Sequence, residues 1–302
     1  MQYRRPKKQI NGILLLDKPL GFSSNQALQK IKWLLQAAKA GHTGTLDPLA
    51  TGLLPLCFGE ATKFAHYLTD ADKTYVATIK LGATTTTGDA EGEVLSTHAV
   101  NVNQLEFEKT CKQFIGEISQ TPPMYSALKF EGKALYEYAR AGVEIERQPR
   151  LVKIHSIELN AFEGDVARIT VTCSKGTYIR TLAEDIGKRL GCGAHLIGLR
   201  RTGTANYHIS QAVSLEQFEA MSSEERLASL APADSAVEHL PAITLDADSV
   251  FYLQQGQVIW RSGVIPQGLL RLYDEQQVFL GLGEQQSDGK IAPKRLMQQV
   301  NN

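Results

Sequence analysis

Residues 166–191, VARITVTCSKGTYIRTLAEDIGKRLG, contain the change from strand to helix that decides the fold. Apolar and polar residues alternate over residues 166–173, which predicts a half-buried strand. Apolar side chains then recur at helical spacing over residues 181–190. The strand therefore leads almost directly into a helix, with Tyr178 and Arg180 at the junction.

Further strands and helices are predicted on the N-terminal side of this junction. Residues 73–81 and 151–159 alternate as strands. Capping-box patterns begin helices at Ser23 and Asn103, and the first helix is expected to continue through Ala38. Strands and helices do not follow one another in a regular βαβ order. We therefore predict an α+β fold with a mixed, mainly antiparallel sheet flanked by helices and loops.

The composition is that of an ordinary globular chain. Of its 302 residues, 43% are hydrophobic and 21% are charged. The apolar stretches are much shorter than the roughly 20 residues that cross a bilayer, and we recognise no secretion signal at the N-terminus. The four cysteines are scattered, which suits a reducing compartment. We expect a cytoplasmic protein without a membrane partner.

The net charge of zero hides an asymmetry along the chain. Residues 1–210 hold 26 Lys or Arg against 20 Asp or Glu, whereas residues 211–302 hold 6 against 12. A basic face on the first part is therefore compatible with a polyanionic partner. The change in composition also places a boundary between residues 235 and 255. We expect a main domain over residues 1–245 and a small β module over residues 249–302.

Residues 41–52, GHTGTLDPLATG, form the densest group of candidate functional residues. Three glycines, a His between small residues and an Asp fixed before a Pro predict an irregular loop that presents side chains. His42 and Asp47 are the side chains that such a loop can offer for chemistry. A turn with a structural Asp is the commoner case for an isolated Asp-Pro pair, so the loop alone leaves both interpretations open.

Other positions also have both a functional and a structural interpretation. Arg180 can keep a nearby carboxylate ionised, or it can be an ordinary surface residue at a strand end. Arg200 and Arg201 follow Leu199 as a basic pair, which is more often a solvated edge than a site. Tyr75, on a predicted strand, is by default a half-buried core residue.

Motifs of several other chemistries are absent from the sequence. The chain has no P-loop, no complete dinucleotide-binding glycine fingerprint and no HExxH pattern. Its seven histidines are scattered, so no zinc cluster is indicated. We therefore expect no metal.

Residues 121–152 combine tandem prolines with aromatic and basic side chains, and we name them the thumb segment. Between residues 121 and 150 there are three Tyr and five Lys or Arg. Such a mixture suits contact with a phosphate backbone that has exposed bases beside it. A solvated amphipathic helix with its loops is the commoner source of this composition, and the residues alone leave that alternative open.

Five blocks, in chain order, resemble the TruB family of stand-alone bacterial tRNA pseudouridine synthases. They are GILLLDKPLGFSS at 12–24, GHTGTLDPLATGLLPLCFGEATKF at 41–64, DKTYVATIKLGATTTTGDAEGEV at 72–94, QTPPMYSALKFEGKALYEYARAG at 120–142, and CSKGTYIRTLAEDIGKRLG at 173–191 followed by LRRTGTANY at 199–207. The tail YDEQQVFLGLGEQQSDGKIAPKRL at 273–296 resembles the family's C-terminal PUA-type RNA-binding module. The resemblance favours the functional interpretation at each of the positions above.

The resemblance implies a role for each candidate residue. Asp47 corresponds to the family's essential aspartate, the catalytic group. Five further residues are implied to bind the target nucleotide: His42, Tyr75, Tyr178, Arg180 and Leu199. Of these, Tyr75 stacks on the target base, and Arg180 pairs with Asp47. Four basic residues are the remaining expected RNA contacts: Lys18, Lys63, Lys129 and Arg140.

The implied reaction isomerises uridine 55 in the T-loop of tRNA to pseudouridine. It breaks the bond between N1 and C1′, turns the uracil and joins its C5 to C1′, so no atom is added and no cofactor is required. The uridine must leave its stack, and the thumb segment is expected to close over the T-loop. Residues 1–245 are then the catalytic domain.

Three alternative activities use related residues. They are an RNA-guided pseudouridine synthase, which shares the GHTGTLDP loop, a tRNA-folding chaperone with incidental modification, and a nucleosidase that releases free uracil. The thumb segment and the short C-terminal module favour the stand-alone enzyme. We expect a monomer that acts on tRNA without a guide RNA.

Overall fold

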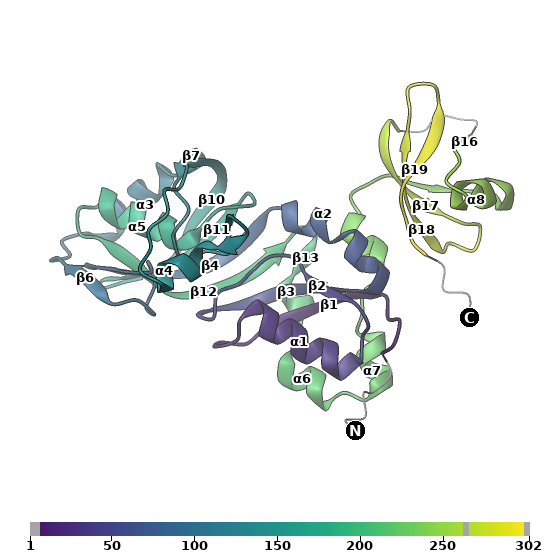
Figure 1. Ribbon diagram of the computed structural model, residues 1–302. Helices are drawn as coiled ribbons and strands as arrows, with labels where there is room; N and C mark the ends of the chain where they lie inside the picture. The colour runs from purple at the N-terminus through teal and green to yellow at the C-terminus, as the bar shows by residue number, and fades with distance from the viewer. Residues whose placement is uncertain (1–6, 262–265, 299–302) are drawn as a thin grey trace.

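The computed structural model describes residues 7–261 and 266–298 (Figure 1). The strands of its larger sheet are β1 (Gly12–Lys18), β2 (Ala40–His42), β3 (Ala50–Phe58), β4 (Lys73–Leu81), β7 (Gly116–Gln120), β10 (Arg150–Glu163), β11 (Val166–Cys173), β12 (Ala194–Thr204), β13 (Tyr207–His208) and β14 (Val213–Ser214). They pair in the order β14-β1-β3-β12-β4-β11-β10-β7, with β2 beside β3 and β13 beside β12. β12 therefore lies inside the sheet, between β3 and β4.

Most neighbouring strands of the larger sheet are antiparallel. β3 and β12 are parallel, as are β1 and β14, whereas β12–β4, β4–β11, β11–β10, β10–β7 and β1–β3 are antiparallel. The predicted mixed, mainly antiparallel sheet is therefore confirmed. The predicted strand over residues 73–81 is β4, and the two predicted over residues 151–159 and 166–173 lie in β10 and β11.

Helices pack in two groups against the larger sheet (Figure 1). The described α-helices are α1 (Ser24–Leu35), α2 (Ala65–Asp70), α3 (Gln104–Lys112), α4 (Leu135–Arg140), α5 (Ile179–Arg189), α6 (Leu215–Ala220), α7 (Ser223–Ala228) and α8 (Ala247–Gln254). α3 and α5 bury Phe107 and Leu182 in one apolar cluster with β4, β11 and β12. α1 and α6 bury Ile31 and Phe218 in another with β1 and β3.

The two predicted helix starts are confirmed. Ser23 Oγ accepts a hydrogen bond from the backbone N–H of Gln26 at 3.2 Å, and Gln26 Oε1 accepts one from the Ser23 N–H at 2.8 Å. Asn103 begins α3 with the same kind of capping box. α1 ends at Leu35, earlier than predicted, because Gln36 adopts a left-handed backbone with φ of 56°. A right-handed helix cannot continue through that conformation.

The predicted C-terminal β module is present as a second sheet. Its strands are β15 (Ala242–Thr244), β16 (Ile259–Trp260), β17 (Gly268–Tyr273), β18 (Phe279–Gln285) and β19 (Lys290–Leu296), in the order β15-β17-β18-β19-β16. The Phe64 and Phe279 rings join this module to the rest of the chain, with centroids 5.4 Å apart. Lys63 Nζ also donates a hydrogen bond to the Leu296 carbonyl at 2.8 Å. The two sheets therefore share apolar and polar contacts.

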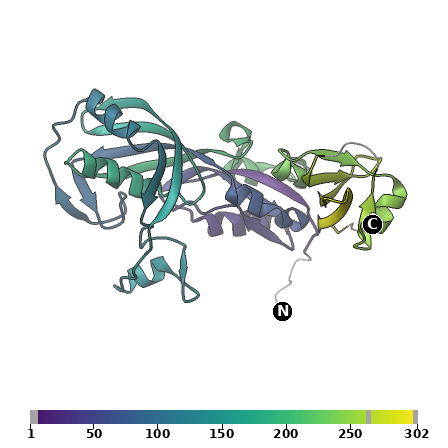
Figure 2. The ribbon, with the colours of Figure 1, turned by 90° about the horizontal axis from the view of Figure 1, so that it is seen from above.

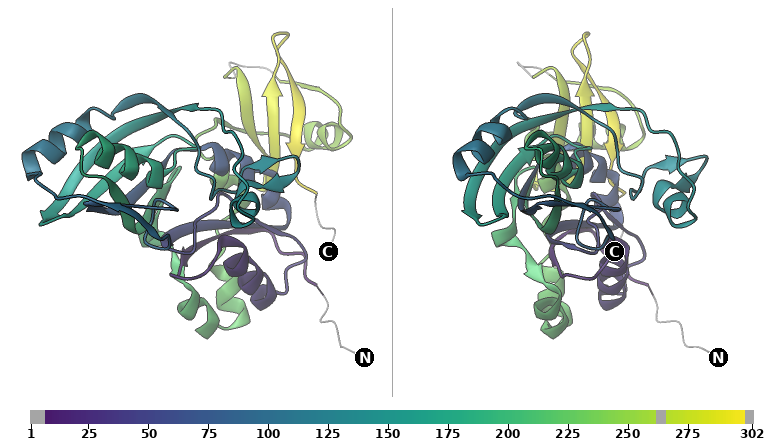
Figure 3. Two further views of the ribbon diagram at one scale, coloured as in Figure 1. Left: turned by 60° about the vertical axis from the view of Figure 1, so that its left-hand side comes forward. Right: turned by 90° about the vertical axis from the view of Figure 1, so that its left-hand side faces the viewer.

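The thumb segment leaves the larger sheet between β7 and β10. It carries a short hairpin, β8 (Lys129–Phe130) and β9 (Lys133–Ala134), followed by α4; a separate hairpin is formed by β5 (Ala83–Thr85) and β6 (Val94–Thr97). Figures 2 and 3 show the thumb segment in teal as a lobe that projects from the body. The Arg140 guanidinium lies 5.4 Å from the Tyr136 ring centroid. A protruding element thus presents basic and aromatic side chains together.

Gly52 allows β3 and β12 to approach each other closely. Its φ is +100°, and a Cβ at this position would lie 2.2 Å from the backbone carbonyl oxygen of Arg201. We predict that Gly52→Ala lowers the free energy of unfolding by about 2 kcal/mol or more, because the backbone must move and the residue is strained. Urea unfolding followed by circular dichroism measures this change.

Gly41→Ala is the matched control for Gly52→Ala. A Cβ at Gly41, in β2, would meet nothing within 4 Å. Its effect on the free energy of unfolding is expected to stay within about 0.5 kcal/mol. Equal losses for the two variants would contradict the argument from close strand approach.

Candidate active site

The loop at residues 41–52 is fixed to the start of α1 by one buried serine. Ser24 Oγ accepts a hydrogen bond from the backbone N–H of Leu46 at 2.7 Å and lies 3.1 Å from the Leu46 carbonyl oxygen, to which it donates. The backbone N–H of Ala50 donates to the Asp47 carbonyl at 3.0 Å and closes the turn. Asp47 is therefore held in place on both sides.

Asp47 faces Arg180, which lies in the first turn of α5. Arg180 Nη2 is 3.0 Å from Asp47 Oδ2 and donates to the Tyr125 carbonyl at 2.6 Å. Arg180 Nη1 donates to the Thr87 carbonyl at 3.0 Å and lies 3.5 Å from Asp89 Oδ2. The residues Arg180 and Asp89 are only 6% and 2% exposed. One buried guanidinium thus joins segments that are far apart in the sequence.

The pKa of Asp47 is raised above its ordinary value, chiefly because burial removes water from the carboxylate. The charge of Arg180 opposes this rise most strongly, the charge of Asp89 adds to the rise, and the charge of Lys18 also lowers the pKa. The Asp47 side chain keeps 39% of its surface exposed. The site therefore presents a reachable carboxylate that is more basic than one in water.

The side chains beside this ion pair line a pocket of about 380 Å³. Tyr75 comes from β4, Leu199 from β12, and Tyr178 from the N-cap of α5. The Gln120 side chain holds the Tyr178 backbone, accepting from its N–H at 3.1 Å and donating to its carbonyl at 3.2 Å. The structure brings together five of the predicted site residues: Asp47, Tyr75, Tyr178, Arg180 and Leu199.

His42 lies at the end of β2, outside the set of residues that line this pocket. Its Nδ1 is buried and has no hydrogen-bond partner among the residues that the structure describes. Burial lowers the pKa of His42, and the charge of Arg201 lowers it further. The imidazole therefore favours its neutral form.

Two of the four basic residues predicted to contact RNA hold the protein itself together. Lys18 is fully buried, and its Nζ donates to the carbonyls of Pro19 and Phe22 at 2.9 and 2.5 Å. Burial lowers the pKa of Lys18 to about 8. Lys63 pairs with Glu60 at 2.6 Å, in addition to its contact with the C-terminal module. Neither ammonium group is free to lie on an open surface.

The other two predicted contacts, Lys129 and Arg140, are exposed on the thumb segment. The base of this segment reaches the pocket, where Ser126 and Leu128 are lining residues. Arg180 contacts the same region through the Tyr125 carbonyl. The exposed thumb and the Asp47 pocket are thus parts of one continuous structure.

The basic pair Arg200 and Arg201 is divided between the two interpretations that the residues alone left open. Arg200 fits the expected solvated edge, since its side chain is 42% exposed and pairs with Asp17 at 2.6 Å. Arg201, the next residue, is 1% exposed and lines the Asp47 pocket. The solvated-edge interpretation therefore fits Arg200, whereas Arg201 lies where the functional interpretation, which the resemblance favours, would place it.

Sequence reasoning also missed Asp89 and Lys73 as parts of the site. Asp89 lies in the turn-rich run TTTTGDAEGE, where an Asp has no local sign of burial. Lys73 is 7% exposed and lines the pocket at the first residue of β4. The one available signal was that both lie in a block that resembles the family.

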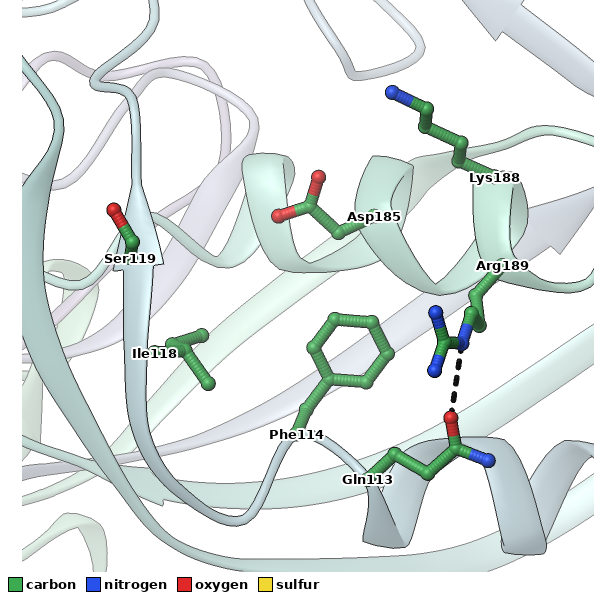
Figure 4. Close-up of a pocket in the computed structure, with 7 residues that line it drawn as sticks. All are labelled: Gln113, Phe114, Ile118, Ser119, Asp185, Lys188 and Arg189. Carbon is green, nitrogen blue, oxygen red and sulfur yellow. Dashed lines mark hydrogen bonds between the residues drawn. The ribbon is translucent and has the colours of Figure 1, made fainter.

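A second hollow, of about 540 Å³, is larger than the Asp47 pocket (Figure 4). It lies between α3, β7 and α5, where Arg189 Nε donates to Gln113 Oε1 at 2.9 Å and Asp185 points toward the open space. Its larger volume alone would make this hollow the better candidate for the active site. Burial raises the pKa of a carboxyl in both hollows, Asp47 in one and Asp185 in the other. Only the Asp47 pocket joins its carboxylate to a buried guanidinium, that of Arg180, so among the described residues we place the chemistry there.

Within residues 7–261 and 266–298, no three His, Cys, Asp or Glu side chains are grouped so that they could hold a metal ion. The helices of these residues are all too short or too polar to span a membrane.

Comparisons with known families match nearly the whole chain. Residues 32–179 match the TruB family pseudouridylate synthase N-terminal domain. Residues 180–238 match the tRNA pseudouridylate synthase B C-terminal domain, and residues 241–297 match the pseudouridine synthase II TruB C-terminal model.

Individual relatives agree with these matches. The tRNA pseudouridine synthase B of Methylobacillus flagellatus is 62% identical over 99% of both chains, and that of Stutzerimonas stutzeri is 54% identical over 98% of both. A crystal structure of a Cbf5-Nop10-Gar1 complex contains a chain that is 28% identical, with a TM-score of 0.72, over 95% of this chain and 84% of that one. The chain belongs to the TruB family of pseudouridine synthases.

Proposed function

We propose that the protein converts uridine 55 in the T-loop of tRNA to pseudouridine. The observation that carries the proposal is the ion pair of Asp47 with the buried Arg180, in a pocket that Tyr75 and Tyr178 also line. The relatives named tRNA pseudouridine synthase B support tRNA as the substrate. The family-like blocks support the T-loop uridine as the target.

Asp47 is the catalytic group in this proposal. Breaking the N1–C1′ bond makes C1′ electron-poor, and an ionised carboxylate can attack C1′, stabilise its positive charge or remove a proton from the sugar. Arg180 keeps Asp47 ionised although burial favours the protonated acid. Because the uracil is recaptured through C5, one carboxylate is enough and no cofactor takes part.

The flipped uridine needs a surface that replaces its lost stacking partners. Tyr75 stacks on the base, and Tyr178 and Leu199 form the rest of the base pocket. His42 lies against the target nucleotide from the edge of the loop. Its neutral imidazole can stack without adding a buried charge.

The thumb segment closes over the T-loop, with Lys129 and Arg140 against its phosphates. Lys18 packs beneath the catalytic loop and supports it. Lys63 holds the C-terminal module through its hydrogen bond to the Leu296 carbonyl. We propose that this module is PUA-like and binds RNA. The enzyme works as a monomer in the cytoplasm, without a guide RNA.

Asp47→Asn is expected to abolish pseudouridine formation while the dissociation constant for tRNA stays within about twofold, because the amide keeps the shape but cannot act as a carboxylate. An unmodified tRNA transcript, incubated without guide RNA, is mapped by carbodiimide treatment and primer extension. Asp185→Asn, in the second hollow, is the control and should stay active. Pseudouridine at position 55 after incubation with Asp47→Asn would contradict the proposal. So would a wild-type protein that binds the tRNA but forms no pseudouridine in it.

The pH dependence of the reaction reports on the pair of Asp47 and Arg180. Activity requires ionised Asp47, so the rate should rise with pH through the raised pKa of that carboxyl. Arg180→Gln removes a charge that lowers this pKa, so the acid limb should move to higher pH. Single-turnover rates across pH measure the shift, with Arg189→Gln as the control. An unmoved acid limb in Arg180→Gln would contradict this role.

The double variant Lys129→Ala with Arg140→Ala tests the thumb segment. Its affinity for tRNA should fall, and the slope of log affinity against log salt should decrease by about 0.7 to 0.9 for each phosphate that the protein no longer neutralises. Binding titrations at several salt concentrations give both quantities. The double variant Lys109→Ala with Lys112→Ala, on α3, is the control. Unchanged affinity and slope in the thumb variant would exclude the proposed contacts.

A further inference from the structure

Arg201 is one of the residues that line the Asp47 pocket, and its charge has no partner of opposite sign among the described residues. It is 1% exposed, and it makes no ion pair with any residue that the structure describes. Its Nε donates to the Leu53 carbonyl at 2.6 Å, but its Nη2 has no hydrogen-bond partner within the described residues. A buried hydrogen-bond donor without a partner lowers the stability of the folded protein, so the presence of Arg201 at this position needs an explanation.

The other buried cations of the site differ from Arg201 in this respect. Lys18 Nζ donates to two backbone carbonyls, and Lys73 Nζ contacts the carbonyls of Leu68, Thr69 and Ala71. Arg180 has carboxylate and carbonyl partners. Among the described cations at the pocket, Arg201 alone combines full burial with an unused donor.

The position of Arg201 points toward the base rather than the phosphates of the substrate. Arg201 and Tyr75 are paired residues in the register of β12 and β4, so their side chains leave the same face of the sheet. A Cβ on Gly44, in the loop that carries Asp47, would lie 3.4 Å from Arg201 Nη1. Because Tyr75 is the proposed stacking partner of the base, this register puts Arg201 on the side of the pocket that the base would occupy.

The charge of Arg201 acts on its surroundings. It lowers the pKa of His42 and of Lys73, in each case after the larger effect of burial. It also lowers the pKa of Tyr75, against the larger rise caused by burial. No described carboxylate oxygen lies within 4.0 Å of an Arg201 nitrogen, so no ion pair neutralises this charge before the substrate binds.

We infer that Arg201 stabilises the negative charge that the uracil carries between bond cleavage and rejoining; this inference rests on the proposed function. When the N1–C1′ bond breaks, its electron pair stays on the uracil, which becomes an anion with charge on N1 and the carbonyl oxygens. The new C5–C1′ bond then uses an electron pair of this anion, C5 loses its proton, and N1 gains one. No atom or electron is supplied from outside.

A fixed guanidinium is suited to this task because the anion exists only during the reaction. A cation that interacts with negative charge in the transition state, but with little charge in the bound substrate, stabilises the transition state more than the ground state. It therefore increases the rate of the chemical step without tightening substrate binding. Arg201 is already oriented by its bond to Leu53, so it needs no reorganisation when the charge develops.

Arg201→Met tests the inference, because methionine fills much of the same volume without a charge. Its single-turnover rate of pseudouridine formation should fall by about 10²- to 10³-fold, the usual loss for one such stabilising group. The dissociation constant for tRNA should stay within about twofold. Arg200→Met is the matched control on the same strand, and its rate should stay close to that of the wild type. A loss of binding that accounts for the whole defect of Arg201→Met would overturn the inference.

A change of leaving group separates an electrostatic role from a structural one. Fluorine at C5 withdraws electrons, so 5-fluorouracil leaves as a better stabilised anion than uracil. The ratio of wild-type to Arg201→Met cleavage rates should therefore be smaller with 5-fluorouridine at the target position. Equal ratios for the two substrates would show a structural role and overturn the inference. Arg201→Lys, which keeps the charge, should retain more activity and gives the same comparison if Arg201→Met does not fold.

Pseudouridine formation by the wild-type enzyme distinguishes a failure of this inference from a failure of the proposed function. If it forms no pseudouridine in tRNA, the proposed function fails. If it is active and Arg201→Met matches Arg200→Met in rate, only the inference about Arg201 fails.

Discussion

The Arg180 guanidinium is the interaction on which the site depends. It holds the carboxylates of Asp47 and Asp89 and the carbonyls of Thr87 and Tyr125. Burying a cation without such oxygens is costly, and the oxygens around Arg180 come from three segments that are distant in the sequence. The catalytic loop, the turn after β5 and the base of the thumb segment are therefore brought to α5 by the same requirement. The contacts that assemble the site are therefore also contacts that hold distant segments of the fold together.

Features set by local pattern could be predicted from the sequence, and features set by distant partners could not. The capping box at Ser23 depends on residues three apart, and the alternation over residues 73–81 depends on neighbours, so both were visible. The burial of Lys18 is a local feature, since its Nζ donates to the carbonyls of Pro19 and Phe22, but no periodic pattern marks it. The pairing of Asp89 with Arg180 likewise joins two blocks that no short-range pattern connects.

Arg200 and Arg201 show this limit most clearly. They are identical residues at adjacent positions, and the pleat of β12 sends one to solvent and the other to the pocket. The register of β12 against β4 shifts just before and just after this pair. A shift of this kind reverses the face of every later residue, so alternation along the strand cannot decide which Arg is buried. The pairing of Arg201 with Tyr75 in the sheet shows that Arg201 is the buried residue of the two.

Phe64 is fully buried, and its ring lies against Phe279 of the C-terminal sheet, with Leu282 in the same apolar cluster. A chain shortened before residue 242 would leave this ring without its cover and would expose an apolar patch on the body. The C-terminal sheet therefore cannot be lost or exchanged by recombination without new side chains around Phe64.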